Sequence, residues 1–238
     1  MTIPIPKKPL FSLPLAVKMV MIDLDGTLID TAPDIAASAN KMLLQLGMPT
    51  HDPSLVATWI GNGVGRLVKR ALIGSLEGEP DPALYERGYP IFLNAYADCV
   101  SKDSRPYPGV VEGLEALKKA EFSLACITNK AEAFTLPLLK DLGLDKYFDL
   151  VLSGDTLPKK KPDPLPLLHA CEHFGISPDH GVLVGDSVND TQAARAAGMP
   201  VILVPYGYNR GQDVNELHPD VVVDSLTDLS QHLSLYTE

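Results

Sequence analysis

Short apolar runs separated by amphipathic stretches fill most of this chain. Six of these runs show little alternation between apolar and polar positions: residues 18–25, 123–129, 149–155, 181–187, 201–206 and 221–225. Continuous apolarity of this length is typical of strands that are buried on both faces. Helical spacing occupies intervals such as 110–120, 132–143 and 190–198. The alternation predicts an α/β fold in which right-handed βαβ units build a doubly wound parallel sheet.

Residues 30–105 interrupt this alternation with helix signals and no convincing strand. Thr31 and Asp34 resemble a capping box that starts a helix, and further helices are expected in 55–61, 65–74 and 81–100. Pro90 lies inside the last of these and predicts a kink or a break. We therefore expect a smaller, all-helical cap domain at 30–105, a core domain formed by 16–29 and 106–238, and an N-terminal tail at 1–15.

Composition narrows the class of protein. The chain has 238 residues, of which 45% are hydrophobic, and it carries a net charge of −10. Such an acidic chain repels nucleic acid and anionic lipid, so we expect neither as a partner. No apolar stretch is long enough to cross a membrane, and Pro9 and Pro14 argue against a signal peptide. Three cysteines without a CxxC pair are typical of reduced thiols. A cytoplasmic monomer or homodimer is expected, and the sequence does not decide between the two.

Polar side chains gather where the predicted strands end. They are Asp23, Asp25, Thr128, Asn129, Lys161, Asp186 and Asp190. In an open parallel sheet the ligand lies beyond the carboxyl ends of the strands, so these groups converge on one edge. Buried carboxylates are costly unless they are paired, and oxygen ligands favour a hard cation, above all Mg²⁺. The pattern predicts a magnesium site that also holds a phosphate.

Four motifs then carry a resemblance to a known family. "DLDGTL", "TNK", the Lys161 of "KKKPDP" and "GDSVND" are similar, in this order, to the signature motifs of the haloacid dehalogenase superfamily, and the DxDGT form marks its phosphatases. The wider match, over most of residues 17–210, resembles the bacterial phosphoglycolate phosphatases. It implies a Rossmann-like core with a helical cap, and Mg²⁺-dependent hydrolysis of a small phosphomonoester, 2-phosphoglycolate first.

The resemblance also implies roles for individual residues. Asp23 would be the nucleophile that forms an aspartyl phosphate, and Asp25 would protonate the leaving group and then take a proton from water. Lys161 would neutralise the phosphoryl oxygens in the transition state. Phosphate would also be bound by Thr27, Thr128 and Asn129. The implied magnesium set is Asp23, the backbone carbonyl of Asp25, Asp186 and, indirectly or through water, Asp190.

Two other motifs contain candidate binding residues. "GNGVG" at 61–65 lacks the strand and the acidic residue of a dinucleotide site, so we expect a cap loop that faces the core. Arg66, which follows it, is expected to bind the substrate's carboxylate; the alternative is a solvated basic helix face. His169 and His173 stand one helical turn apart, and a polar helix face is favoured over a zinc site.

The sequence leaves several functions open. A sugar-phosphate phosphatase of the same family is the nearest alternative. A β-phosphoglucomutase-like isomerase would use the same aspartates, although that family usually has Val where Thr27 stands. A non-catalytic binding protein is a third alternative, and the intact Asp23 and Asp25 argue against it.

Overall fold

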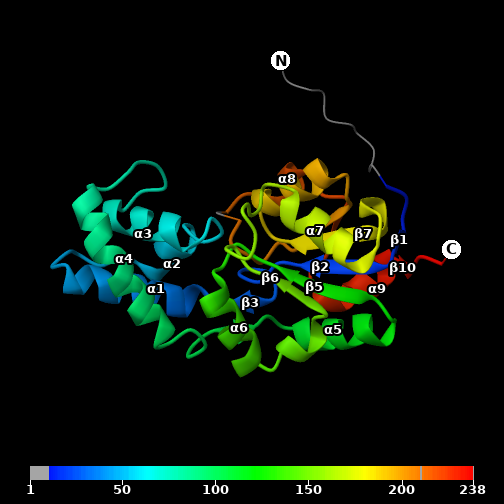
Figure 1. Ribbon diagram of the computed structural model, residues 1–238, viewed down its shortest axis with the longest axis horizontal. Helices are drawn as coiled ribbons and strands as arrows, with labels where there is room; N and C mark the ends of the chain where they lie inside the picture. Colours follow the sequence, from blue (N-terminus) through cyan, green and yellow to red (C-terminus); the bar gives the residue numbers. More distant parts are fainter. Residues whose placement is uncertain (1–10, 210, 238) are drawn as a thin grey trace, which may run out of the picture.

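A central sheet of six parallel strands organises the computed structural model, which describes residues 11–209 and 211–237 (Figure 1). The strand order is β6-β5-β2-β7-β8-β9. The strands are β2 (Met19–Ile22), β5 (Ser123–Ile127), β6 (Leu150–Leu152), β7 (Gly181–Gly185), β8 (Val201–Leu203) and β9 (Val221–Val222). The predicted doubly wound parallel sheet is confirmed.

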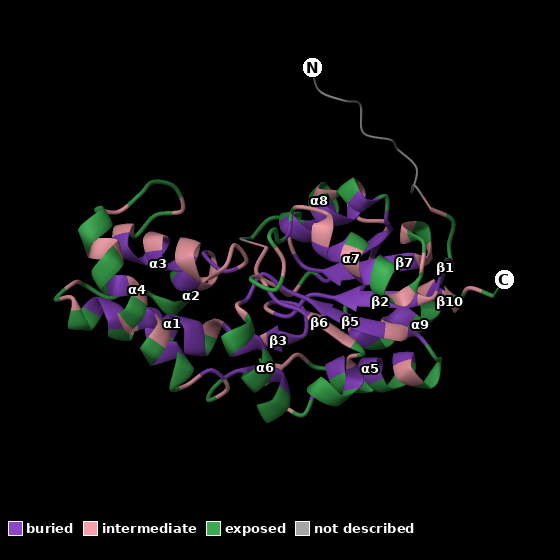
Figure 2. Cartoon of the chain, in the orientation of Figure 1, coloured by how far each residue is buried: buried purple, intermediate pink, exposed green. Residues whose placement is uncertain are grey.

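Strand β2 shows why the apolar runs lack alternation. Val20 and Ile22 belong to one buried cluster, which includes side chains of α5 (Val110–Lys119) and α6 (Glu132–Asp141). Met19 and Met21 belong to another, with side chains of α7 (Leu165–Phe174) and α8 (Val188–Ala197). Figure 2 shows the sheet buried between these two helical layers. Because both faces of the strand are covered, every position is apolar.

The strands end earlier than the apolar runs suggest. Strand β2 ends at Ile22 and β8 ends at Leu203, whereas the predicted runs continued to residues 25 and 206. After β2 the Asp23 N–H still bonds to the carbonyl of Val184 at 2.9 Å, and the chain then turns at Gly26, where φ is 88°. The predicted catalytic carboxylates therefore lie in a loop beyond the strand.

Four helices lie between β3 (Ile29–Asp30) and β4 (Arg105–Pro106), which pair in antiparallel fashion. They are α1 (Ala32–Gln45), α2 (Pro53–Ala57), α3 (Val64–Ile73) and α4 (Pro82–Ala97), and we call them the cap helices. Figure 1 shows them gathered to one side of the sheet. Helix α4 continues through Pro90, so the break allowed there does not occur. The division into a core and a cap domain stays a prediction.

The predicted capping box at the start of α1 is wrong. Thr31 makes no side-chain cap, because its hydroxyl donates to Asp25 Oδ1 at 2.8 Å. The Asp34 carboxylate instead accepts the N–H groups of Asp103 and Ser104 at 3.0 and 2.7 Å. Both side chains therefore tie the cap helices to the chain segments that connect them with the sheet.

Strands near the two ends of the described chain pair at the end of the sheet that lies away from the cap helices (Figure 1). Strand β1 (Leu15–Val17) pairs in parallel with β10 (Leu233–Leu235), so the last residue of the expected tail belongs to a strand. Residues 1–10 of that tail lie outside the described residues. Short helical segments complete the fold: η1 (Asp145–Tyr147), η2 (Pro178–His180), η3 (Val214–Leu217), η4 (Leu226–Asp228) and α9 (Leu229–His232). Within the described ranges, no helix has the length and apolarity needed to cross a membrane.

Candidate active site

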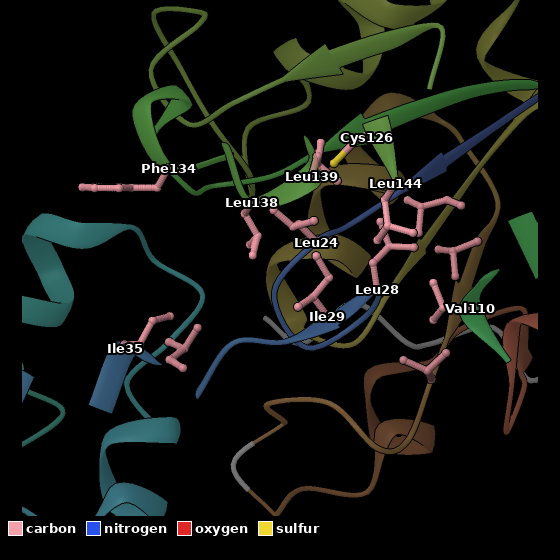
Figure 3. Packing of buried hydrophobic residues seen from close by; sticks show 14 of the residues in the cluster. Leu24, Leu28, Ile29, Ile35, Val110, Cys126, Phe134, Leu138, Leu139 and Leu144 are labelled. Carbon is pink, nitrogen blue, oxygen red and sulfur yellow. The ribbon is translucent and has the colours of Figure 1, made fainter. Parts of the chain in front are cut away.

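Asp23 and Asp25 stand on a loop that apolar side chains anchor. Leu24, Leu28 and Ile29 are fully buried and face the interior near α6 (Figure 3). The Leu24 N–H donates to Asp23 Oδ1 at 2.7 Å. Gly26 has φ of +88°, and a Cβ there would come within 2.5 Å of Asp186 Oδ2. A glycine is therefore needed both for the turn and for the close approach of the two carboxylate loops.

The segments that follow three strands bring four of the predicted side chains together. One carboxylate oxygen from each of Asp23, Asp186 and Asp190 lies within 4.8 Å of the others. Lys161, which is 2% exposed, contacts two of these residues. Its Nζ is 2.9 Å from Asp23 Oδ1 and 2.7 Å from Asp190 Oδ1. We call these four residues the phosphate-end cluster.

Negative charge outweighs positive charge in the phosphate-end cluster. Burial raises the pKa of Asp23 to about 7; Lys161 opposes this rise, and Asp190 adds to it. Burial, together with the charges of Asp190 and Asp23, also holds the pKa of Asp186 well above its usual range. Burial lowers the pKa of Lys161, but Asp190 and Asp23 outweigh it, so this pKa lies above its ordinary value. One ammonium group thus contacts two of the three buried carboxylates.

This donor set fits a hard divalent cation. Asp186 accepts a hydrogen bond from Thr27 Oγ1 at 3.1 Å and another from the Tyr208 N–H at 2.6 Å. No ion pair of the described residues reaches its carboxylate, so its charge lacks a cationic partner there. Carboxylate oxygens held rigidly at one sheet edge are the ligands that Mg²⁺ prefers.

The predicted phosphate-binding residues are placed in different ways. Thr128 lines the cavity, and its Oγ1 accepts the Lys130 N–H at 3.2 Å, which leaves a hydroxyl hydrogen to donate. Thr27 donates its hydroxyl hydrogen to Asp186 instead. Asn129 uses both amide hydrogens on the carbonyls of Gly61 and Lys161, at 2.9 and 2.8 Å. Thr27 and Asn129 thus have protein partners here, and their role in binding phosphate stays a prediction.

A second buried lysine received no role in the sequence analysis. Lys130, the last letter of "TNK", is 6% exposed, and its Nζ lies 3.0 Å from Asp25 Oδ1. The same ammonium lies 4.8 Å from the ring centre of Tyr96 on α4. Burial raises the pKa of Tyr96 to about 12, so its hydroxyl keeps its hydrogen at neutral pH. The available signal was the position of Lys130 directly after the strand-end Thr128 and Asn129.

The loop after β8 also received no role: the predicted strand ran to residue 206, and Tyr208 lies just beyond it. Tyr208 donates its N–H to Asp186 and its hydroxyl hydrogen to Asp30 Oδ1 at 2.7 Å. The Tyr208 hydroxyl oxygen in turn accepts the N–H groups of Thr31 and Ala32 at 2.7 and 2.8 Å. Tyr208 thereby connects the phosphate-end cluster with the start of α1.

A cavity lies between the sheet edge and the cap helices. Its core wall consists of Asp23, Asp25, Thr128, Asn129, Lys130, Ala131 and Phe134. Its cap wall consists of Ile35, Ile60, Gly61, Gly63, Val64, Leu67, Phe92 and Tyr96. The reactive groups are therefore all on the core side, and they face an almost entirely apolar cap.

The glycine-rich cap loop rests on the core. Gly61 O accepts from the side-chain amides of Asn129 and Asn189, at 2.9 and 3.2 Å. Lys160 Nζ donates to Asn62 O at 3.0 Å. These contacts hold the cap against the carboxylate edge and close one side of the cavity.

Arg66 is not brought to the other predicted residues. Its guanidinium donates to the loop between α3 and α4, where it meets Glu77 and Glu79 at 3.1 and 2.9 Å and the carbonyls of Leu76 and Gly78. These acidic side chains lie only 11 and 13 residues further along the chain than Arg66.

His169 and His173 do not belong to a metal site in the described ranges. The one group of possible metal ligands there consists of Asp23, Asp186 and Asp190.

A doubly wound sheet with a lysine-bridged carboxylate cluster at its carboxyl edge is the arrangement expected of a hydrolase. The haloacid dehalogenase-like hydrolase family matches residues 20–204, and the chain belongs to this family. The enzyme is a phosphoric monoester hydrolase. The phosphoglycolate phosphatase of Thiobacillus denitrificans is 59% identical over 217 residues, which cover 91% of this chain and 96% of the relative. That of Nitrosospira multiformis is 59% identical over 213 residues, or 90% and 94% of the two chains.

Solved structures give the same result. A crystal structure from Haemophilus somnus, described as a predicted phosphoglycolate phosphatase, aligns with a TM-score of 0.85 at 37% identity. The alignment covers 90% of this chain and 96% of that one. The family expected from the four motifs is confirmed.

Proposed function

We propose that this chain is a Mg²⁺-dependent phosphatase that hydrolyses 2-phosphoglycolate to glycolate and phosphate through an aspartyl phosphate. The observation that carries this proposal is the lysine-bridged cluster of Asp23, Asp186 and Asp190, whose member Asp23 lines a cavity with an apolar far wall. The relatives at 59% identity are named for this activity.

Asp23 would act as the nucleophile. Its Oδ1 is occupied by the Leu24 N–H and by Lys161, which orient the carboxylate. Attack of the other oxygen on phosphorus forms the aspartyl phosphate and releases the alkoxide. Lys161 keeps positive charge beside the phosphoryl oxygens, where negative charge increases in the transition state.

Asp25 would move the proton in both steps. Thr31 Oγ1 and Lys130 Nζ hold its Oδ1 at 2.8 and 3.0 Å, so the carboxyl group keeps one orientation. In the protonated form it gives its proton to the leaving alkoxide. The resulting carboxylate then takes a proton from the water that attacks the aspartyl phosphate, and inorganic phosphate leaves.

Asp23, Asp186 and the backbone carbonyl of Asp25 would hold the magnesium ion. Asp190 would support the site through Lys161 or through water. When bound, the ion would offset the repulsion between a carboxylate and a dianionic phosphate.

The cap wall favours a small acid over a sugar. A sugar phosphate presents several hydroxyl groups, each of which needs a hydrogen-bond partner once it is buried. Ile60, Val64, Leu67 and Phe92 offer none. A two-carbon acid places few groups against this wall, which supports 2-phosphoglycolate over the sugar-phosphate alternative.

Phosphate release from a panel of phosphomonoesters, measured with and without Mg²⁺, tests the proposal. We expect the highest kcat/KM for 2-phosphoglycolate and no turnover after removal of the metal. A higher kcat/KM for a hexose phosphate would show that 2-phosphoglycolate is not the preferred substrate. Full activity in EDTA would show that the enzyme does not need a metal ion.

We also propose that the enzyme acts in the cytoplasm without a nucleic-acid or membrane partner. The net charge of −10 and the three free cysteines support this.

A further inference from the structure

The substrate proposed above has two anionic groups, and the phosphate-end cluster accounts for one. Lys161 already lies between Asp23 and Asp190, where the phosphate would bind. The carboxylate at the other end of 2-phosphoglycolate still needs a cation, because an unpaired charge is costly beside an apolar wall.

The cap cations are engaged elsewhere. The Arg66 guanidinium contacts the loop at 76–79. Arg70 is buried, and it donates to the carbonyls of Trp59 and Leu76 and to Asn62 Oδ1. Among the described residues that line the cavity, Lys130 is the one with a cationic side chain.

Lys130 also lies where the leaving group would be. Its Nζ is 3.0 Å from Oδ1 of Asp25, the residue that would protonate the ester oxygen. In 2-phosphoglycolate a single methylene separates that oxygen from the carboxylate. A cation in contact with Asp25 is therefore within reach of the carboxylate of the same bound molecule.

A second polar group beside Lys130 points to the same ligand. The Tyr96 hydroxyl is buried and has no hydrogen-bond partner within the described residues, although Tyr96 lines the cavity. A buried hydroxyl without a partner is unfavourable unless a ligand completes it. The ring of the same residue lies 4.8 Å from the Lys130 ammonium and stabilises it by a cation–π interaction.

From these contacts we infer that Lys130 and Tyr96 form the subsite that binds the substrate's carboxylate, opposite the phosphate-end cluster. This subsite rests on the proposed function. Lys130 lies on the core side and Tyr96 on α4, so a bound carboxylate would join the sheet edge to the cap helices. The apolar wall strengthens the ion pair by excluding water.

Three phosphomonoesters that share a phosphate–oxygen–methylene unit test this inference. They are 2-phosphoglycolate, ethyl phosphate and phosphoethanolamine, which carry a negative, a neutral and a positive group beyond the methylene. For the wild type we expect kcat/KM to fall in this order. Any effect of Lys130 through Asp25 is common to all three esters and cancels in their ratios.

Lys130→Met should lower the ratio of kcat/KM for 2-phosphoglycolate to that for ethyl phosphate by roughly 10- to 100-fold, as expected for a hydrogen bond to a charged group. The same substitution should also raise kcat/KM for phosphoethanolamine relative to kcat/KM for ethyl phosphate. Tyr96→Phe keeps the ring and should lower the first ratio by about 2- to 10-fold. Lys140→Met, on the exposed face of α6, is the matched control and should leave every ratio unchanged.

The possible failures are distinguishable. If the wild type hydrolyses ethyl phosphate as efficiently as 2-phosphoglycolate, the substrate assignment fails, and the subsite fails with it. If the wild type prefers 2-phosphoglycolate and Lys130→Met keeps that preference, the assignment stands and the subsite alone is wrong. If Lys130→Met fails to fold, two measurements do not need it: the order of kcat/KM for the three esters in the wild type, and the ratio of 2-phosphoglycolate to ethyl phosphate in Tyr96→Phe. An unchanged ratio in Tyr96→Phe would contradict the subsite.

Discussion

Two buried lysines line the same sheet edge, and their surroundings differ in charge. Lys161 contacts two carboxylates of a three-carboxylate cluster. Lys130 contacts one carboxylate and an aromatic face. The first end of the site has more carboxylates than cations, and the second has one of each.

This difference indicates what each end can bind. An excess of buried carboxylate requires a further cation, and the phosphate then binds to a metal and a lysine together. An ammonium group has three N–H donors, so Lys130 can contact Asp25 and a bound carboxylate at the same time. The same residue type thus serves the phosphate at one end and the leaving group at the other.

Of the two lysine substitutions, Lys161→Met should have the larger effect on activity. The phosphate-end cluster would lose its only ammonium, and we expect kcat/KM to fall by roughly 10²- to 10³-fold, the range found when one transition-state donor is removed. The loss should be equal for 2-phosphoglycolate, ethyl phosphate and phosphoethanolamine. A loss confined to 2-phosphoglycolate would show that the two lysines do not divide the substrate in this way.

The cluster residues could be predicted because a parallel sheet brings its strand ends together whatever the intervening sequence. Asp23, Asp186 and Lys161 follow directly from that rule. Arg66 could not be placed, because Glu77 and Glu79 in the next loop compete for it. Lys130 could not be recognised either, since its aromatic partner Tyr96 comes from a cap helix that precedes it by 34 residues.

The pH dependence of stability should separate the metal-free and magnesium-loaded proteins. Asp23 has a pKa of about 7 in the folded state against an ordinary value of 3.8, so the folded protein binds this proton more tightly than the unfolded chain. That stabilisation is complete below the unfolded pKa and is lost as pH rises through about 7. Asp186 shifts in the same direction.

In EDTA we therefore expect Tm to fall between pH 4 and pH 7. Mg²⁺ binds the deprotonated carboxylates, so the increase in Tm that it causes should grow over the same interval, with a free energy of about 2.7 kcal/mol at a hundred times Kd. Calorimetry at several pH values measures both trends. A magnesium effect that is independent of pH would show that Asp23 and Asp186 are not ligands.

Arg66→Ala should have the smallest effect. Its acidic partners are exposed, and exposed ion pairs contribute about 0–1 kcal/mol to stability. We expect a slightly lower Tm and an unchanged ratio of kcat/KM between 2-phosphoglycolate and ethyl phosphate. A selective loss on 2-phosphoglycolate would return Arg66 to the carboxylate-binding role that the sequence suggested.

The central claim is that Asp23 is phosphorylated during turnover. Rapid acid quenching of the wild type with Mg²⁺ and ³²P-labelled 2-phosphoglycolate should trap label on the protein, and base should release it, as expected for an acyl phosphate. Peptide fragmentation should place the label on Asp23. Asp23→Asn, checked for deamidation, should trap none and turn over on the order of 10⁴-fold more slowly or not at all. Label on another residue, or a normal rate in Asp23→Asn, would contradict the account.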